Sequence, residues 1–172
     1  MPIDAAVGIG VVLSALLYLL EASGDLSVVE LVRHDDGTIE ERKHPKRLKD
    51  NQVTVLDIYG PLFYASAQTL GRLLPSPLEV RNPVVVLRLR GHTKVGFTLI
   101  NVLTSYARKL KDVNGRLYLS GMNELAYEQL ERAGKLGQIG NVHTYSATPM
   151  RGQSTRAAVA DAREWLISQN EE

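Results

Sequence analysis

Hydrophobic and polar positions follow three different periods along the chain. Residues 5–20 (AAVGIGVVLSALLYLL) are apolar on all sides of a helix, and the hydroxyls of Ser14 and Tyr18 are their only conventional polar groups. A short stretch of alternating positions follows, and from Val53 onward strand-like runs take turns with segments of helical spacing. This pattern predicts an apolar helix, a hairpin and an α/β domain, in that order.

The apolar segment has three interpretations. A secretory signal would carry Lys or Arg ahead of it, whereas Met1 to Asp4 contain an acid and no base. A buried core helix would keep one polar face, which is missing here. A transmembrane helix, or the remaining part of one, accounts for the uniform apolarity, for Gly8 and Gly10, and for the polar stop at residues 21–25, although the segment is near the lower limit of about 17 residues for a span. We expect a membrane helix over residues 1–22, and the other two interpretations stay open.

Residues 23–52 are expected to form a hairpin and an exposed basic linker. Val28–Arg33 is rich in β-formers, Asp36-Gly37 is a turn signal, and the segment IEERK that follows alternates. The hairpin runs into a cluster of basic residues, Arg42, Lys43, Lys46, Arg47 and Lys49. If the apolar helix is in a membrane, this cluster marks the cytoplasmic side. Two hypotheses stay open for it: contact with anionic headgroups, at about 1 kcal/mol for each side chain, or a merely hydrated linker.

Residues 53–170 are expected to form one α/β domain. Strands are predicted at Val53–Tyr59, Val84–Leu89, Arg116–Ser120 and in the segment NVHTY. Helices are predicted at Phe63–Leu74, at Thr98–Lys111, from Asn123 to a stop at Gly134, and from a capping Ser154 to the end. The expected architecture is a mixed sheet covered by about four helices, mainly on one side, after the apolar helix and the hairpin.

Length, charge and cysteine content limit the function. A chain of 172 residues suffices for one domain with an appendage. Twenty basic and nineteen acidic residues give a formal charge of +1, so no broad field attracts nucleic acid, and no nucleic-acid partner is expected. The absence of cysteine excludes disulfides, a cysteine nucleophile and thiolate metal sites.

Two sets of side chains have the residue types of a chemical site. The first set has metal-ligating types in and beside the predicted hairpin: His34, Asp35, Asp36 and His44. It lacks the spacing of metal ligands, so we interpret it as turn chemistry on a solvated hairpin. The second set has the types of a hydrolase triad: Ser66, His92 and Asp57. No nucleophile elbow surrounds them, and we therefore expect no catalytic residue, no metal and no cofactor.

Several segments in their order and spacing resemble the STAS domain at the cytoplasmic C-terminus of SulP-type anion permeases. They are VTVLDIYGPLFYASA, VVVLRLRG, RLYLSGMNELAYEQLERAG and the closing Ala-rich helix with REWL. The most specific pieces are Gly60-Pro61-Leu62-Phe63 and Leu119-Ser120-Gly121. The apolar start and VVELVRHDDGTIEERK are similar to the end of the last permease span and its run into that domain. The resemblance covers nearly the whole chain.

The resemblance implies a regulatory and assembly domain of a sulfate or other anion transporter. Such a domain would help permease protomers pair, couple transport to cytoplasmic partners, or stabilise the transporter. The implied partners are the lipid membrane, through the N-terminal helix, and a permease transmembrane domain or a second copy of the chain. The implied location is at the membrane, with the STAS domain in the cytoplasm. One span cannot enclose an anion pathway, so we expect no transport by this chain alone.

One loop departs from the pattern of STAS domains that act as anti-sigma-factor antagonists. Those domains carry Asp-Ser-Ser/Thr-Gly between strand and helix, and the first Ser accepts phosphate. By strand and helix, the corresponding residues here are Gly96, Phe97, Thr98 and Leu99. Phe97 cannot accept phosphate, and Thr98 is expected to be the N-cap of the helix. A freestanding signalling module of the antagonist type remains the alternative function.

The same loop is also a candidate ligand or interaction site. Lys94, Gly96 and the helix start at Thr98 offer one ammonium and free backbone N–H groups to an anion. Nucleotide binding, and with it a nucleotide-responsive sensor, is a further alternative that the resemblance raises. No Walker-type or Rossmann glycine pattern supports it, and a plain loop with a solvated Lys94 explains the same residues.

Overall fold

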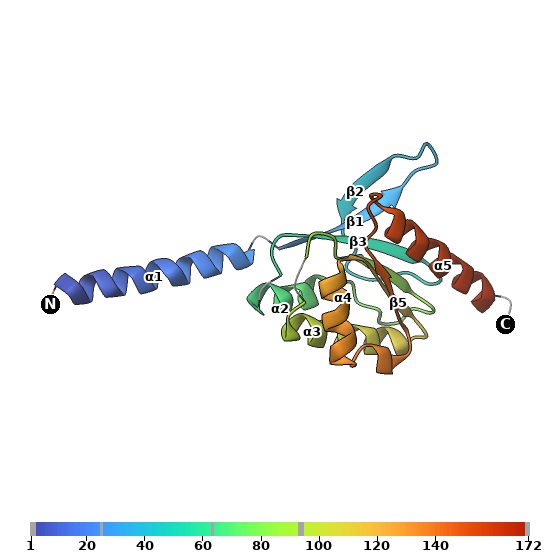
Figure 1. Cartoon of the computed structure of the whole chain (residues 1–172). Coiled ribbons are helices and arrows are strands. Elements are labelled where there is room, and N and C mark those ends of the chain that lie inside the picture. The colour runs from blue at the N-terminus through green and yellow to red at the C-terminus, as the bar shows by residue number, and fades with distance from the viewer. Residues whose placement is uncertain (1–2, 25, 63, 93–94, 171–172) are drawn as a thin grey trace.

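Within the described part of the chain, six strands form one mixed sheet in the order β2-β1-β3-β4-β5-β6 (Figure 1). A computed structural model describes residues 3–24, 26–62, 64–92 and 95–170. The strands are β1 (Ser27–Arg33), β2 (Ile39–Lys43), β3 (Val53–Tyr59), β4 (Val84–Arg88), β5 (Arg116–Met122) and β6 (Val142–Ser146). β2, β1 and β3 pair antiparallel, and β3 to β6 pair parallel. The predicted mixed sheet is confirmed.

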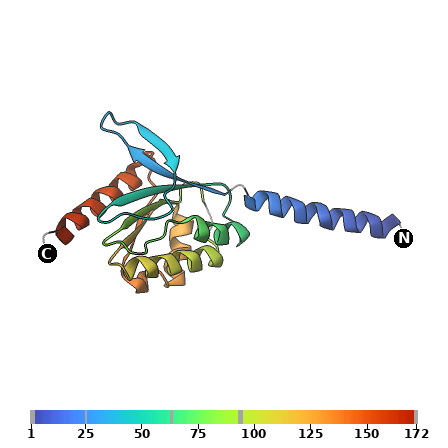
Figure 2. The same cartoon turned by 180° about the vertical axis from the view of Figure 1, so that it is seen from behind.

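Five α-helices accompany the sheet in the described residues. They are α1 (Ile3–Gly24), α2 (Tyr64–Leu73), α3 (Phe97–Lys111), α4 (Glu124–Ala133) and α5 (Gln153–Asn170), and a short 3-10 helix spans Gly137–Ile139. α2, α3 and α4 cover one face of the sheet, and α5 covers part of the other (Figures 1 and 2). The helices therefore lie mainly on one side of the sheet, as the sequence predicts.

Strand β4 shows how the two faces share the core. Val84, Val85, Val86 and Leu87 are fully buried, as expected for a central parallel strand that is covered on both sides. Val85 and Leu87 pack into the large cluster under α2, α3 and α4. Val84 and Val86 pack into the smaller cluster against Ala158, Ala162 and Leu166 of α5. The continuous apolar run in the sequence thus supplies both hydrophobic layers.

The helix boundaries confirm the two predicted ends of α4 and correct two predicted caps. Asn123 caps α4, because its side-chain oxygen accepts a hydrogen bond from Ala126 N at 2.8 Å, and Gly134 ends α4 in the left-handed region. The prediction of Thr98 as N-cap of α3 is wrong, because the cap is Gly96 and no side chain completes it. Ser154 does not cap α5 either. The Gly152 carbonyl already accepts the N–H of Arg156 at 2.9 Å, so this helix begins before Ser154.

Helix α1 forms over the apolar segment and projects away from the domain (Figures 1 and 2). The large apolar side chains described on it are all exposed: Val7, Ile9, Val11, Val12, Leu13, Leu16, Leu17, Tyr18 and Leu19. Within the part of the chain that the structure describes, no helix has the length and apolarity needed to cross a membrane. The helix is confirmed, whereas the predicted membrane span is not.

The segment between β2 and β3 is anchored to the domain. Leu48 is buried in the large core cluster. Its N–H donates to Ser76 O at 3.0 Å, and Ser76 N donates to Lys46 O at 2.9 Å. Asp50 accepts a further bond from Arg81 N at 2.8 Å. The expectation of an exposed linker therefore needs correction at Leu48, the apolar residue within the basic run.

An aromatic cluster lies between α5 and strands β5 and β6. The rings of Tyr118 and His143 stack at a centroid distance of 4.8 Å, and Tyr145 donates its hydroxyl to Asp161. Burial, together with the nearby Arg116 guanidinium, lowers the pKa of His143 below its ordinary value. Among the described residues, the buried Nε2 of His143 has no hydrogen-bond partner. The folded protein therefore favours a neutral imidazole at this position.

This cluster predicts an acid-sensitive stability. As the pH falls below about 6.5, His143 binds a proton in the unfolded chain before it does so in the folded protein, so the free energy of unfolding decreases. We expect His143→Phe to reduce this loss, because the ring is kept and the titrating group is removed. The loss is not abolished, since burial also lowers the pKa of His92. Urea denaturation at pH 7.5 and 5.5 measures the effect, and His34→Asn on the exposed hairpin is the control. An unchanged pH dependence in His143→Phe would contradict the prediction.

Candidate interaction surfaces

The loop before α3 is held from beneath by α4. The side chain of Val95 is buried in the large core cluster, and its backbone N–H donates to Gln129 Oε1 at 2.8 Å. Gly96 follows in an extended conformation, exposed, and its carbonyl accepts the N–H of Ile100. Lys94, which the sequence places in this candidate site, is outside the described residues. The structure therefore positions Gly96, Phe97 and Thr98 of the predicted set.

Phe97 and Thr98, in the first turn of α3, differ in their exposure and in their surroundings. Phe97 is 67% exposed, and Lys135 Nζ lies 4.3 Å from the centroid of its ring, a cation–π geometry. Thr98 is half-buried and lines a cleft of about 480 Å³ between α2 and α3, together with Gln68, Gly71 and Asn101 among others. The first turn of α3 contains no acidic residue. This end of the domain thus offers an exposed aromatic ring beside a cation.

The predicted basic cluster is divided in the structure. Arg42 and Lys43 are consecutive in β2, so their side chains leave the strand on opposite faces. Arg42 forms an ion pair with Glu40 at 2.6 Å, and Arg47 forms one with Glu79 at 3.2 Å. Lys46 and Lys49 are exposed in the segment that follows β2. A membrane-surface role of this cluster stays a prediction.

The polar residues of the hairpin bond to neighbours within the same hairpin. Asp36 Oδ1 accepts hydrogen bonds from the N–H and the hydroxyl of Thr38, and these bonds lower the pKa of Asp36. His34 Nε2 lies 2.7 Å from Glu40 Oε2. In the ranges that the structure describes, no three His, Asp or Glu side chains gather as metal ligands.

Asp57 and Arg88 form a partly buried ion pair on the α5 face of β3 and β4. Their closest atoms are 2.6 Å apart, and their side chains are 12% and 20% exposed. Burial raises the pKa of Asp57, although the Arg88 guanidinium opposes this shift. His92, grouped with Asp57 in the hydrolase hypothesis, instead has Nε2 at 3.5 Å from Ile58 O. The Asp57 carboxylate is therefore paired with the Arg88 guanidinium.

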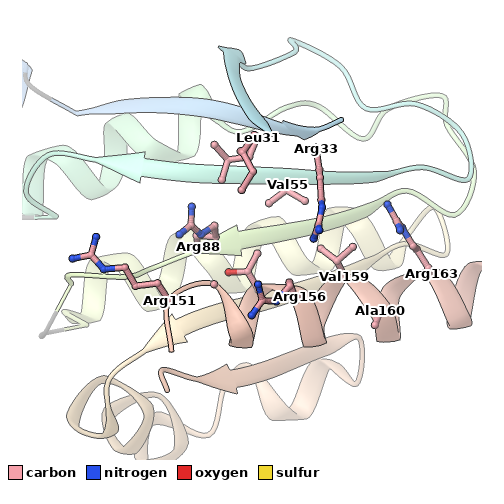
Figure 3. Close-up of a pocket in the computed structure, with 12 residues that line it drawn as sticks. Leu31, Arg33, Val55, Arg88, Arg151, Arg156, Val159, Ala160 and Arg163 are labelled. Carbon is pink, nitrogen blue, oxygen red and sulfur yellow. The ribbon is translucent and has the colours of Figure 1, made fainter. Parts of the chain in front are cut away.

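A groove beside Arg88 is the feature that sequence reasoning missed (Figure 3). It lies between the sheet and α5, has a volume of about 420 Å³, and is lined by five arginines from three elements and one loop: Arg33, Arg88, Arg151, Arg156 and Arg163. The only signal in the sequence is the spacing of Thr155, Arg156, Val159, Ala160 and Arg163, which form one stripe of a helix. Nothing in the sequence says that this stripe faces β1 and β4.

Comparison with solved structures shows similarity to structures of solute carrier 26 member A9. A structure of SLC26A9 is 14% identical, with a TM-score of 0.60, over 91% of this chain and 27% of that one. The murine Solute Carrier 26 family member A9 (Slc26a9) anion transporter in the inward-facing state is 13% identical, with a TM-score of 0.62, over 93% of this chain and 26% of that one. The chain thus spans about a quarter of their length. At these identities the likeness shows the fold.

The family profile gives the second comparison. No curated protein matches the sequence. The profile of the STAS domain matches residues 44–148, more than half of the chain, from the end of the hairpin to the residues after β6. The chain therefore belongs to the STAS domain family.

Proposed function

We propose that the chain is the cytoplasmic regulatory and assembly domain of a SulP-type anion transporter. The observation that carries the proposal is the agreement of the fold, over nearly the whole chain, with one part of two anion-transporter structures. The STAS family match supports an interaction domain. Anion passage itself requires several helices around a hydrated cavity, so it belongs to a membrane unit with which this domain acts.

Helix α1 supplies the contact with the membrane unit in this proposal. It leads directly towards β1, and its apolar side chains are exposed all along its described length. Exposed apolar surface of this extent marks an interaction site, because a stable isolated protein rarely leaves it in water. We place α1 against the apolar surface of the membrane unit or the surrounding lipid, with the sheet domain in the cytoplasm.

The exposed ring of Phe97, beside Lys135, is the second contact surface in the proposal. An aromatic ring with a cation at its face suits the centre of a protein interface. A phosphoswitch of the antagonist type finds no acceptor at Gly96 or Phe97. We therefore favour constitutive contact with a transporter or a second copy over a kinase-controlled module.

Membrane fractionation tests the proposed placement. We expect the intact protein to stay with membranes after carbonate extraction and, after mild solubilisation, to co-purify with a polytopic anion permease. The expected effect of Leu16→Lys together with Leu17→Lys in α1 is release of the protein from membranes. Lys46→Gln together with Lys49→Gln is the control for headgroup attraction alone. Recovery of the intact protein entirely in the soluble fraction would refute the placement of α1. Isolation with a kinase or sigma regulator would favour the freestanding module.

A further inference from the structure

The arginine-lined groove on the α5 face is separate from the surfaces assigned above. Its sheet side is formed by Leu31 and Arg33 of β1, Ile39 of β2, Val55 of β3 and Arg88 of β4. Its helix side is the stripe of α5 from Thr155 to Arg163. Arg151, in the loop just before the N-terminus of α5, completes this side (Figure 3). The groove exists because α5 packs over β4, β5 and β6, while β1 and β2 extend beyond it.

The charge of the groove has one sign. All five charged residues of its lining are arginines. Arg88 is the one that is neutralised, through its ion pair with Asp57. For Arg33, Arg151, Arg156 and Arg163, no ion pair is present among the described residues. Guanidinium groups stay protonated at all physiological pH values, so the lining of the groove keeps a net positive charge.

The floor of the groove is apolar. It is formed by five apolar side chains, Leu31, Ile39, Val55, Val159 and Ala160. Among the described residues that line the groove, Thr155 is the only one with an uncharged polar side chain. Ile39 is 63% exposed, on an otherwise charged hairpin strand. A volume of about 420 Å³ is in the range of small-molecule sites, which are typically apolar with a few polar groups that fix orientation. The groove thus combines a hydrophobic floor with a guanidinium rim.

We propose that this groove binds an organic anion that carries an apolar chain. The chain would lie on the floor between β1 and α5, and its phosphate, sulfonate or carboxylate would meet the guanidinium groups of Arg156 and Arg163. Planar guanidinium forks are suited to bidentate bonds with such oxyanions. In Figure 3 the Arg33 and Arg163 side chains extend into the space between β1 and α5, which places cations on both banks of the groove.

The composition of the groove selects this ligand over simpler ones. An inorganic anion would use the arginines and leave the five apolar residues of the floor in water. A nucleotide base would bring polar edges to a floor whose side chains offer only the Thr155 hydroxyl as an uncharged hydrogen-bonding group. An amphiphilic anion contacts the arginines with its charged group and covers the apolar floor with its chain. The same chemistry is found in a soluble acyl or alkyl phosphate and in an anionic lipid at a bilayer surface.

Calorimetric titration of the intact protein with octyl phosphate, below its micelle concentration, tests the proposal. We expect octyl phosphate to bind at one site. Octanol and inorganic phosphate are each expected to bind at least about tenfold more weakly, because octanol lacks the anionic group and inorganic phosphate lacks the alkyl chain. Arg156→Gln with Arg163→Gln is expected to weaken octyl phosphate binding at least about tenfold. Arg108→Gln with Arg132→Gln, on α3 and α4, changes the net charge equally and is expected to leave binding unchanged. Ala160→Glu, which brings a carboxylate into the groove, is expected to abolish it.

Equal affinity of the native protein and the Arg156/Arg163 variant would overturn the proposal, as would equal affinity for octyl phosphate and octanol. Vesicles of phosphatidylcholine, with and without phosphatidic acid, identify the source of the ligand. If octyl phosphate binds the groove and the double variant also loses attachment to phosphatidic acid vesicles, the ligand is a bilayer lipid. If octyl phosphate binds and vesicle attachment is unchanged, the ligand is soluble. If neither depends on the two arginines, the groove is not an anion site.

Discussion

Replacement of Asn141 by alanine is expected to lower the free energy of unfolding by about 2–4 kcal/mol. The Asn141 side chain is buried, and its Nδ2 donates to two carbonyl oxygens, Ala107 O and Gly115 O, each at 2.9 Å. These bonds join the residue before β6 to α3 and to the residue before β5. Alanine removes both bonds, and a buried carbonyl such as Gly115 O that loses its donor costs about 1–3 kcal/mol.

Urea denaturation measures the effect of Asn141→Ala at neutral pH. Asn101→Ala is the matched control, because Asn101 is exposed and its described hydrogen bond is with the Lys135 side chain. We expect the control to change the free energy of unfolding by less than about 0.5 kcal/mol. A loss in Asn141→Ala as small as that of the control would mean that the two bonds do not hold the sheet to α3.

Leu87→Ala is expected to destabilise the domain by about 2–5 kcal/mol. Leu87 is fully buried in the central strand β4 and packs in the cluster under α2, α3 and α4. Its neighbours in this layer are held by paired strands on both sides, so the cavity cannot collapse easily. Leu78→Ala is the control, since Leu78 is 65% exposed.

Thermal and urea denaturation of both leucine variants give the comparison. The expected order of stability is native, then Leu78→Ala close to it, then Leu87→Ala well below. If Leu87→Ala were as stable as Leu78→Ala, the two-layer core assigned to β4 would be wrong.

The elements of the fold were predictable because each has a local signature. β3 matches its prediction residue for residue, since a run of β-forming residues ends at the Gly60-Pro61 break. The Asn123 and Gly134 caps of α4 follow from the chemistry of those two residue types. Thr98 failed as a cap because a hydroxyl residue near a helix start resembles a cap even when the extended backbone at Gly96 begins the helix earlier.

The candidate sites were less predictable, since they depend on which surfaces meet. The basic run from Arg42 to Lys49 is continuous in sequence, yet strand alternation and two acidic partners divide it. The arginine groove shows the reverse. Arg33, Arg88 and Arg163 are far apart in sequence, and only the packing of α5 on the central strands of the sheet brings them to one groove. For the same reason, the burial of Leu48 follows from its tie to Ser76 and not from its basic neighbours.

Anion uptake by cells that contain this protein tests the proposed function most directly. Uptake of radiolabelled sulfate and other small anions would be compared in native cells, in cells from which residues 1–172 are deleted, and in deletion cells that receive the native sequence or Leu87→Ala. We predict that uptake of at least one anion falls on deletion and is restored by the native sequence but not by Leu87→Ala. Unchanged uptake of every anion after deletion would contradict the assignment to an anion transporter.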